Sequence, residues 1–112
     1  MPDERTTLKA SIDSYLKTLA PSVWYRKRWG GGVYQHSGEW DYVLCVDGQH
    51  VEVEAKHPVT KPPLKADQEN HGRRIRAAGG ITVSVTSRHE LENAILAIRL
   101  GHVGRGDRCD GG

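Results

Sequence analysis

The sequence predicts an α/β fold in which a small mixed sheet carries helices on both of its faces. Its 112 residues, of which 37% are hydrophobic and 27% charged, suit a single polar domain. Segments with helical and strand periodicity follow one another in the order α-β-β-β-α-β-α. The run YVLCV at 42–46 is apolar throughout and rich in β-formers, which is typical of a strand buried on both faces.

An amphipathic helix is predicted over residues 4–20, where apolar side chains recur at helical spacing on one face. Pro21 ends this helix. A glycine-rich loop follows, in which we expect a short strand near Val33 and Tyr34. The GGG at 30–32 indicates a flexible turn rather than a nucleotide-binding loop, because no Gly-Lys-Ser/Thr follows it.

A β-hairpin is predicted next. Asp47-Gly48 is a two-residue turn signal that joins the strand at 42–46 to a returning strand over 49–56. The segment at 57–63 is predicted to be a loop, because its three prolines are incompatible with a regular strand ladder.

The second half of the chain predicts a helix, a strand and another helix. The first of these helices covers 64–78 and is ended by the glycines at 79–80. The strand covers 81–86. Ser87 and Glu90 then form the capping-box signature of the third helix.

Residues 1–100 are therefore expected to form one domain. The tail at 101–112, with five glycines in twelve residues, is expected to be disordered. Cys45 and Cys109 have no C-x-x-C partner, which indicates a reduced protein without a structural disulfide. The N-terminus has no apolar signal core, and no apolar run approaches the roughly 20 residues that span a bilayer. We therefore expect a cytoplasmic protein that makes no membrane contact.

Charged residues alternate along VEVEAK at 51–56, so Glu52, Glu54 and Lys56 share one face of a strand. A solvated sheet face gives the same pattern. The predicted hairpin also brings Asp41, just before its first strand, beside Glu54 near the end of its second strand. Two carboxylates and an ammonium group then converge at one end of the sheet.

Carboxylates at such close range repel each other unless a cation joins them. Their oxygens favour Mg²⁺ or Mn²⁺, and the backbone carbonyl of Ala55 would add a ligand to those of Asp41 and Glu54. Such an ion polarises a phosphoryl oxygen and lowers the pKa of a bound water. Lys56 would orient that water or stabilise the charge that develops in phosphodiester cleavage. Glu52 is expected mainly to solvate the strand face.

Gln68 and His71 interrupt the apolar stripe of the helix predicted over 64–78. A buried amide without a partner costs about 1–3 kcal/mol. Gln68 would therefore contact Lys56, a metal-bound water or a scissile phosphate. Alternatively, both side chains lie at the edge of the helix face, in water.

Two basic clusters, WYRKRW and GRRIR, suit phosphate backbones and exposed bases, although solvated faces give the same pattern. The loop before Asp41 would add phosphate contacts. Six histidines are scattered without the spacing of a zinc site. The candidate DNA-binding residues are Arg26, Lys27, Arg28, Tyr34, Ser37, Arg73 and Arg74.

Three segments, GEWD at 38–41, VEVEAKHP at 51–58 and the run at 63–91, resemble the VRR-NUC domains of the PD-(D/E)XK nucleases. The resemblance is greatest to the small stand-alone forms carried by phages, and it covers residues 8–98. Two departures are visible. Trp40 stands where the family pattern Gly-x-Pro-Asp has proline, and no first-helix acidic residue is in register with the family's extra ligand. The nearest such residues are Glu4 and Asp13.

The resemblance implies a restriction-endonuclease-like α-β-β-β-α-β core and Mg²⁺- or Mn²⁺-dependent hydrolysis of DNA. It implies that Asp41 and Glu54 are metal ligands, Lys56 is the catalytic lysine and Gln68 supports them. It also implies a homodimer that acts on branched DNA such as four-way junctions, in a bacterial or phage-infected cell.

The leading hypothesis is therefore a metal-dependent endodeoxyribonuclease that acts as a homodimer on structured DNA. A second hypothesis is a DNA-binding module that keeps this fold without catalysis. A third is a protein-interaction domain whose hairpin end is merely solvated.

Overall fold

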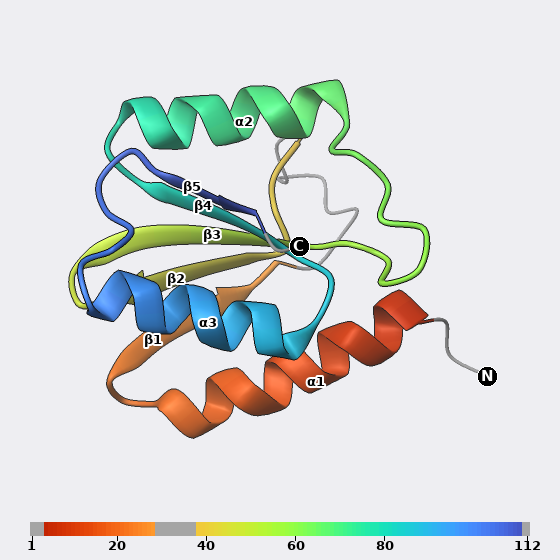
Figure 1. The fold of residues 1–112 in the computed structure, drawn as a ribbon, viewed down its shortest axis with the longest axis horizontal. Coiled ribbons are helices and arrows are strands. Elements are labelled where there is room, and N and C mark those ends of the chain that lie inside the picture. The colour runs from red at the N-terminus through yellow and green to blue at the C-terminus, as the bar shows by residue number, and fades with distance from the viewer. Residues whose placement is uncertain (1–3, 29–37, 111–112) are drawn as a thin grey trace.

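The computed structural model describes residues 4–28 and 38–110, which form one five-stranded sheet and three helices (Figure 1). In chain order the elements are α1 (Glu4–Leu19), β1 (Val23–Lys27), β2 (Tyr42–Val46), β3 (Gln49–Ala55), α2 (Ala66–Ala77), β4 (Ile81–Val85), α3 (Arg88–Arg99) and β5 (Arg108–Asp110). The predicted α/β class and the mixed sheet are confirmed.

The strands lie in the order β1-β2-β3-β4-β5. Strand β2 is antiparallel to both of its neighbours, β1 and β3, and β4 and β5 continue the sheet in parallel with β3. The turn between β2 and β3 is at Asp47-Gly48, as predicted. Their φ angles of 49° and 82° are the left-handed conformations that a two-residue hairpin turn requires.

One face of the sheet carries the apolar core. Leu44, Val51 and Val83 are buried on this face. They pack against α1 and α3, which lie side by side below the sheet in Figure 1. The core extends into the apolar stripe predicted for the first helix, which includes Leu8 and Ile12.

The opposite face of the sheet is covered by α2 (Figure 1) and carries buried polar side chains. Glu52 and Glu54 are only 1% and 5% exposed there, beside Thr82 and Ser84 of β4. A solvated strand face is therefore excluded for these two glutamates. Carboxylates buried to this extent need ionic or hydrogen-bonded partners.

Of the predicted capping box at the third helix, the N-cap bond of Ser87 is confirmed, but the Glu90 side chain reaches back to Thr86 rather than to the Ser87 backbone N–H. The Ser87 hydroxyl accepts a hydrogen bond from the Glu90 backbone N–H at 3.1 Å, and the Glu90 carboxylate accepts one from the Thr86 hydroxyl at 2.8 Å. This cap fixes the point at which the chain leaves β4 and enters α3.

The first strand differs from the prediction. β1 lies at Val23–Lys27, where Val23 is buried and Tyr25 packs against the core. The strand expected near Val33 and Tyr34 falls outside the described residues. The alternation of Val23 and Tyr25 with exposed side chains is a strand signal, but it is hidden in the sequence by the large apolar Trp24 between them and the basic residues after them.

The C-terminal tail also differs from the prediction, because Arg108–Asp110 forms β5 instead of being disordered. Cys109 packs against the core, and Gly106 N–H donates to the Gly80 carbonyl at 3.1 Å. The edge of β4 offers backbone groups that a following segment can pair with. The glycine content of the tail alone does not predict this strand pairing.

No helix within 4–28 and 38–110 has the length and apolar character needed to cross a membrane.

Candidate active site

Asp41 and Glu54 are neighbours, as the hairpin predicted. Tyr42 pairs with Val53 in the ladder, so the preceding Asp41 falls beside Glu54. The Ala55 N–H donates to Asp41 Oδ2 at 2.9 Å, and the Asp41 N–H donates to Glu54 Oε1 at 3.2 Å. Each carboxylate is therefore held in place by the backbone beside the other.

Gln68 reaches this pair from the first turn of α2. Its Nε2 donates to Glu54 Oε2 at 2.9 Å, and its Oε1 accepts from the Lys65 N–H at 3.1 Å. The predicted need for a partner is met by Glu54 itself rather than by Lys56. Since both ends of the amide are engaged, Gln68 fixes the Glu54 carboxylate relative to the start of the helix.

The electrostatics of the site favour the binding of a cation. Burial raises the pKa of Glu54, and the nearby Asp41 carboxylate raises it further, to about 7, although the Arg5 guanidinium opposes the change. The second negative charge is therefore costly in the metal-free protein at neutral pH. A cation bound between the two carboxylates would remove that cost.

Two basic residues of α1 meet these carboxylates. Arg5 Nη2 lies 3.2 Å from both Asp41 oxygens and 3.6 Å from Glu54 Oε2, and its Nε donates to the Ala55 carbonyl at 3.0 Å. Lys9 Nζ lies 2.9 Å from Asp41 Oδ1. Sequence reasoning missed both residues. They are one helical turn apart, which places them on one face of the predicted helix.

The acidic residues considered as first-helix ligands lie elsewhere. Glu4 is 3.9 Å from His57 Nε2. Asp13 accepts hydrogen bonds from Lys27 and from the Tyr42 hydroxyl, each at 2.9 Å. No contact joins either residue to Asp41 or Glu54.

A pocket of about 220 Å³ opens beside Glu54, between the N-terminal ends of α1 and α2 and the loop after β3. It is lined by Arg5, Lys56, His57, Lys65 and Gln68, among others. The Lys56 amine makes no hydrogen bond or ion pair with the part of the chain that the structure describes. It is thus available to an anionic ligand in the pocket.

The donor set is small for a metal site. Among the described residues, no group of three or more His, Cys, Asp or Glu side chains is arranged to hold an ion. Asp41 and Glu54 supply carboxylate oxygens and Ala55 a carbonyl, and all three already converge on the Arg5 guanidinium. These oxygens fit a hard divalent ion with several water ligands, provided that Arg5 withdraws.

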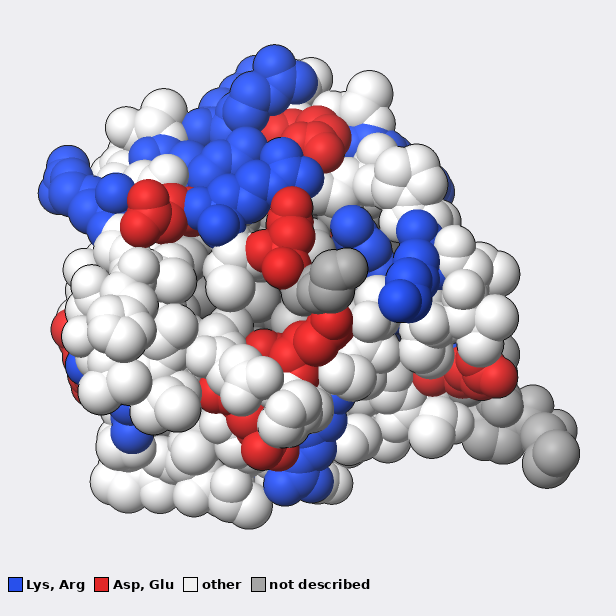
Figure 2. Space-filling model, in the orientation of Figure 1, with Lys and Arg blue, Asp and Glu red and all other residues white. Residues whose placement is uncertain are grey.

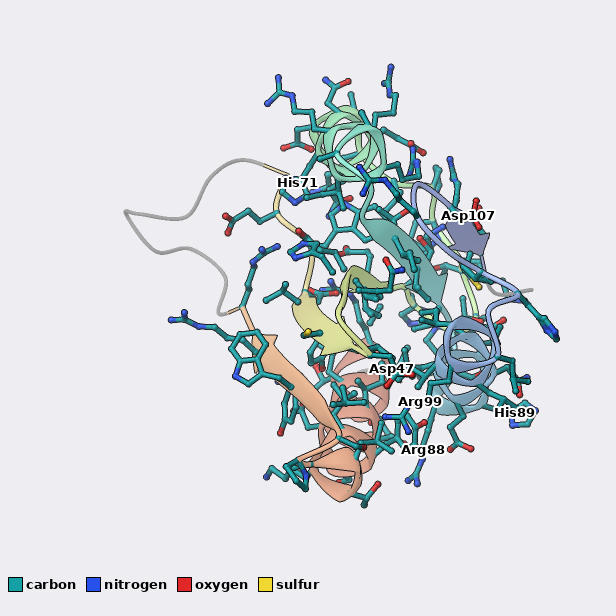
Figure 3. The ribbon with its side chains drawn as sticks, turned by 90° about the vertical axis from the view of Figure 1, so that its left-hand side faces the viewer. Asp47, His71, Arg88, His89, Arg99 and Asp107 are labelled. Carbon is teal, nitrogen blue, oxygen red and sulfur yellow. The ribbon has the colours of Figure 1, made fainter. Side chains whose placement is uncertain are left out.

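Glu52 belongs to a separate buried cluster. It accepts hydrogen bonds from Arg28 at 2.7 Å, and His50 and His71 each place Nε2 2.8 Å from its oxygens. Figure 3 shows His71 on the side of α2 that faces the sheet. Burial pushes the pKa of Glu52 upward, but the hydrogen bonds from Arg28, His50 and His71 outweigh burial and lower it. This cluster attaches α2 to the sheet.

The basic residues of WYRKRW point in different directions because side chains alternate along a strand. Arg26 is exposed, whereas Lys27 pairs with Asp13 and Arg28 pairs with Glu52. The three basic residues therefore do not form one DNA-binding surface, because Arg28 forms an ion pair with the buried Glu52. Tyr34 and Ser37 lie outside the described residues.

The basic side chains of α2 lie on the surface. Arg73 and Arg74 are exposed. Figure 2 shows Lys and Arg side chains gathered over α2 at the top of the molecule. Because an α-helix rises 1.5 Å per residue, Arg73 lies about 8 Å along the axis from Gln68 at the pocket.

Trp40 anchors the segment before Asp41. Its side chain is 2% exposed, its Nε1 donates to the Gln68 carbonyl at 3.0 Å, and it packs on Gly72. Trp40 thus ties Asp41 to the helix that carries Gln68.

Neither a protein-family model nor a curated protein matches this sequence.

Proposed function

We propose that this protein is a metal-dependent endodeoxyribonuclease with the PD-(D/E)XK type of active site. The observation that carries the proposal is the convergence of Asp41, Glu54 and the Ala55 carbonyl on one cationic group. A pocket with an available lysine amine adjoins that point. The mixed sheet with helices on both faces supports the proposal at the level of fold class, and the restriction-endonuclease-like core is part of the proposal by resemblance.

In this mechanism Asp41, Glu54 and the Ala55 carbonyl would hold Mg²⁺ or Mn²⁺. The ion supplies Lewis-acid chemistry, by polarising a phosphoryl oxygen and making water more acidic. Lys56 lines the same pocket, where its ammonium group would stabilise negative charge on the phosphodiester and orient the attacking water. Gln68 holds the Glu54 carboxylate in its ligating orientation.

The DNA substrate is supported by the surface charge near the pocket. The exposed arginines of α2 begin about 8 Å along the helix axis beyond Gln68 and, five and six residues on, lie away from the side of the helix that carries Gln68. A backbone that places one phosphate in the pocket would therefore meet them by continuing over the outer surface of α2. The resemblance to VRR-NUC domains adds two further parts to the proposal, which are selectivity for branched DNA and action as a homodimer.

A catalytically inactive DNA-binding module of the same fold is the second candidate. The position of Arg5 favours it, because a guanidinium group already neutralises the carboxylates. In such a module the basic surface would bind DNA, and the buried acidic pair would be a structural ion-pair network.

Cleavage assays distinguish the two candidates. We expect the protein to cut supercoiled plasmid or a synthetic four-way junction with Mn²⁺ or Mg²⁺ and not with EDTA. Lys56→Ala should reduce the rate by at least about a hundredfold, and its thermal stability should not change because the amine has no described partner. DNA binding without cutting under any of these metal conditions would favour the inactive module. Cutting that survives both EDTA and Lys56→Ala would contradict the mechanism.

A further inference from the structure

Arg5 occupies the position that the proposed function assigns to a metal ion. Its Nε binds the Ala55 carbonyl at 3.0 Å, and its Nη2 lies 3.2 Å from Asp41 Oδ1 and Oδ2 and 3.6 Å from Glu54 Oε2. One side chain therefore contacts all three of the groups that would ligate the ion. Among the three groups, the Lys9 ammonium contacts the Asp41 carboxylate.

We propose that Arg5 is a tethered counter-ion, which keeps the two carboxylates together in the metal-free protein and which a divalent ion must displace. This inference rests on the proposed function, because it assumes that Asp41 and Glu54 bind the ion. It makes Arg5 a positioning residue that sets the affinity of the site for metal.

The location of Arg5 permits such an exchange. Its side chain is 41% exposed, compared with 6% for Glu54 and 13% for Asp41. It lies in the first turn of α1, where the backbone N–H groups lack intrahelical partners and helices fray most readily. The guanidinium can thus leave while the buried carboxylates stay in place.

The pocket beside Glu54 offers a position for the displaced Arg5 side chain. Arg5 already lines the pocket together with Lys56 and Lys65. Once a divalent ion neutralises the carboxylates, the guanidinium is left in this pocket as a bidentate donor suited to a phosphate oxygen. Metal entry would therefore prepare the pocket for an anionic substrate as well as load the site.

Calorimetric titration with Mn²⁺ in the absence of DNA tests the proposal. Arg5→Gln removes the competing cation, so we expect its Kd for Mn²⁺ to be about tenfold lower than that of the wild-type protein. Arg99→Gln is the matched control. Arg99 also faces an aspartate, Asp47, at 4.0 Å, but Asp47 lies in the turn between β2 and β3, at the other end of this hairpin from Asp41 and Glu54. Its Kd should equal the wild-type value.

Thermal unfolding supplies a second measurement that does not depend on activity. In EDTA, Arg5→Gln should unfold at a lower temperature than the wild-type protein, because its buried carboxylates lose their counter-ion. Saturating Mn²⁺ should then raise the unfolding temperature of Arg5→Gln more than that of the wild type. If Arg5→Gln fails to fold, Arg5→Lys keeps the charge on a side chain that cannot bridge all three groups, and its Kd should lie below the wild-type value.

The outcomes separate this inference from the proposed function. Equal Mn²⁺ affinity of the wild-type and Arg5 variants, with binding intact, would overturn the role of Arg5 and leave the nuclease proposal standing. Weaker binding by the Arg5 variants would make Arg5 a supporter of the metal site and would also overturn the inference. If no variant binds Mn²⁺, both the inference and the metal-dependent mechanism are wrong.

Discussion

Glu54 is the residue of this site at which burial most strongly opposes a negative charge. Its side chain is almost fully enclosed and lies beside a second carboxylate, and the result is a pKa of about 7 in the folded protein against 4.5 for the ordinary carboxyl. A raised pKa means that the folded protein holds the proton more tightly than the unfolded chain does. The metal-free protein should therefore lose stability as pH rises from about 4.5 to about 7.

Glu54→Gln removes this titration and tests its sign. At pH 8 in EDTA we expect the variant to be more stable than the wild type by about 1–3 kcal/mol, with the difference vanishing near pH 5. Urea unfolding across this pH range is the measurement. Glu92→Gln, on the surface of α3, should follow the wild-type curve. A constant difference between Glu54→Gln and the wild type at all pH values would show that Glu54 does not titrate in this range.

At the scale of single residues, the sequence predicted the acidic pair but not its basic partner. A two-residue turn fixes strand register, so the proximity of Asp41 and Glu54 follows from counting residues back from Asp47-Gly48. Arg5 cannot be found in this way. Its position depends on how the first helix docks on the sheet, and that is decided by packing over the whole core.

At the scale of elements, α2 is held against the sheet by a row of specific contacts. Gln68 meets Glu54, His71 meets Glu52, and Trp40 packs on Gly72. This helix is mostly polar, so little apolar burial attaches it, and the polar contacts and the Trp40 ring must supply its position. The helix in turn fixes Gln68 at the pocket.

Gly72→Ala tests how closely α2 must approach. A methyl group at this position would lie 2.9 Å from the Trp40 ring and 3.2 Å from Arg76 Nη1, so the helix or the ring must move. We expect a loss of about 1–3 kcal/mol in the free energy of unfolding, together with weaker Mn²⁺ binding as Gln68 shifts. Gly104→Ala is the control, since nothing lies within 4 Å of the added methyl group. Equal stability of the two variants would contradict the close packing described above.

The polar face of the sheet also explains why the helices and strands were easier to predict from the sequence than the contacts between them. Alternating charges on VEVEAK correctly indicated a strand. The same alternation could not show that Glu52 is buried under a helix with Arg28 and His71 rather than solvated. Likewise, β5 has no propensity signal in Arg108–Asp110, because that strand forms by pairing with an edge that exists only in the folded sheet.

At the scale of the whole molecule, a nearly balanced net charge of +2 conceals an uneven distribution. The acidic pair is largely enclosed, while basic side chains spread over α2 (Figure 2). Such a surface attracts a polyanion without requiring a high net charge.

Replacing both Arg73 and Arg74 by Ser tests this surface. We expect weaker DNA binding and a smaller dependence on salt, with the slope of log K against log salt reduced by up to about two units. Fluorescence anisotropy with labelled duplex at several salt concentrations gives that slope. Arg99→Ser changes the same residue type elsewhere on the molecule and should leave the slope unchanged. An unchanged slope for the double variant would place the DNA contact on another face.

The central claim is that Asp41 and Glu54 form a site for a divalent ion. The most direct measurement is anomalous X-ray diffraction from a crystal of the protein soaked in Mn²⁺. We predict a peak within coordination distance of both carboxylates and of the Ala55 carbonyl, with the Arg5 guanidinium displaced into the pocket. A saturated crystal in which Arg5 still bridges these groups, and no peak lies between them, would contradict the account.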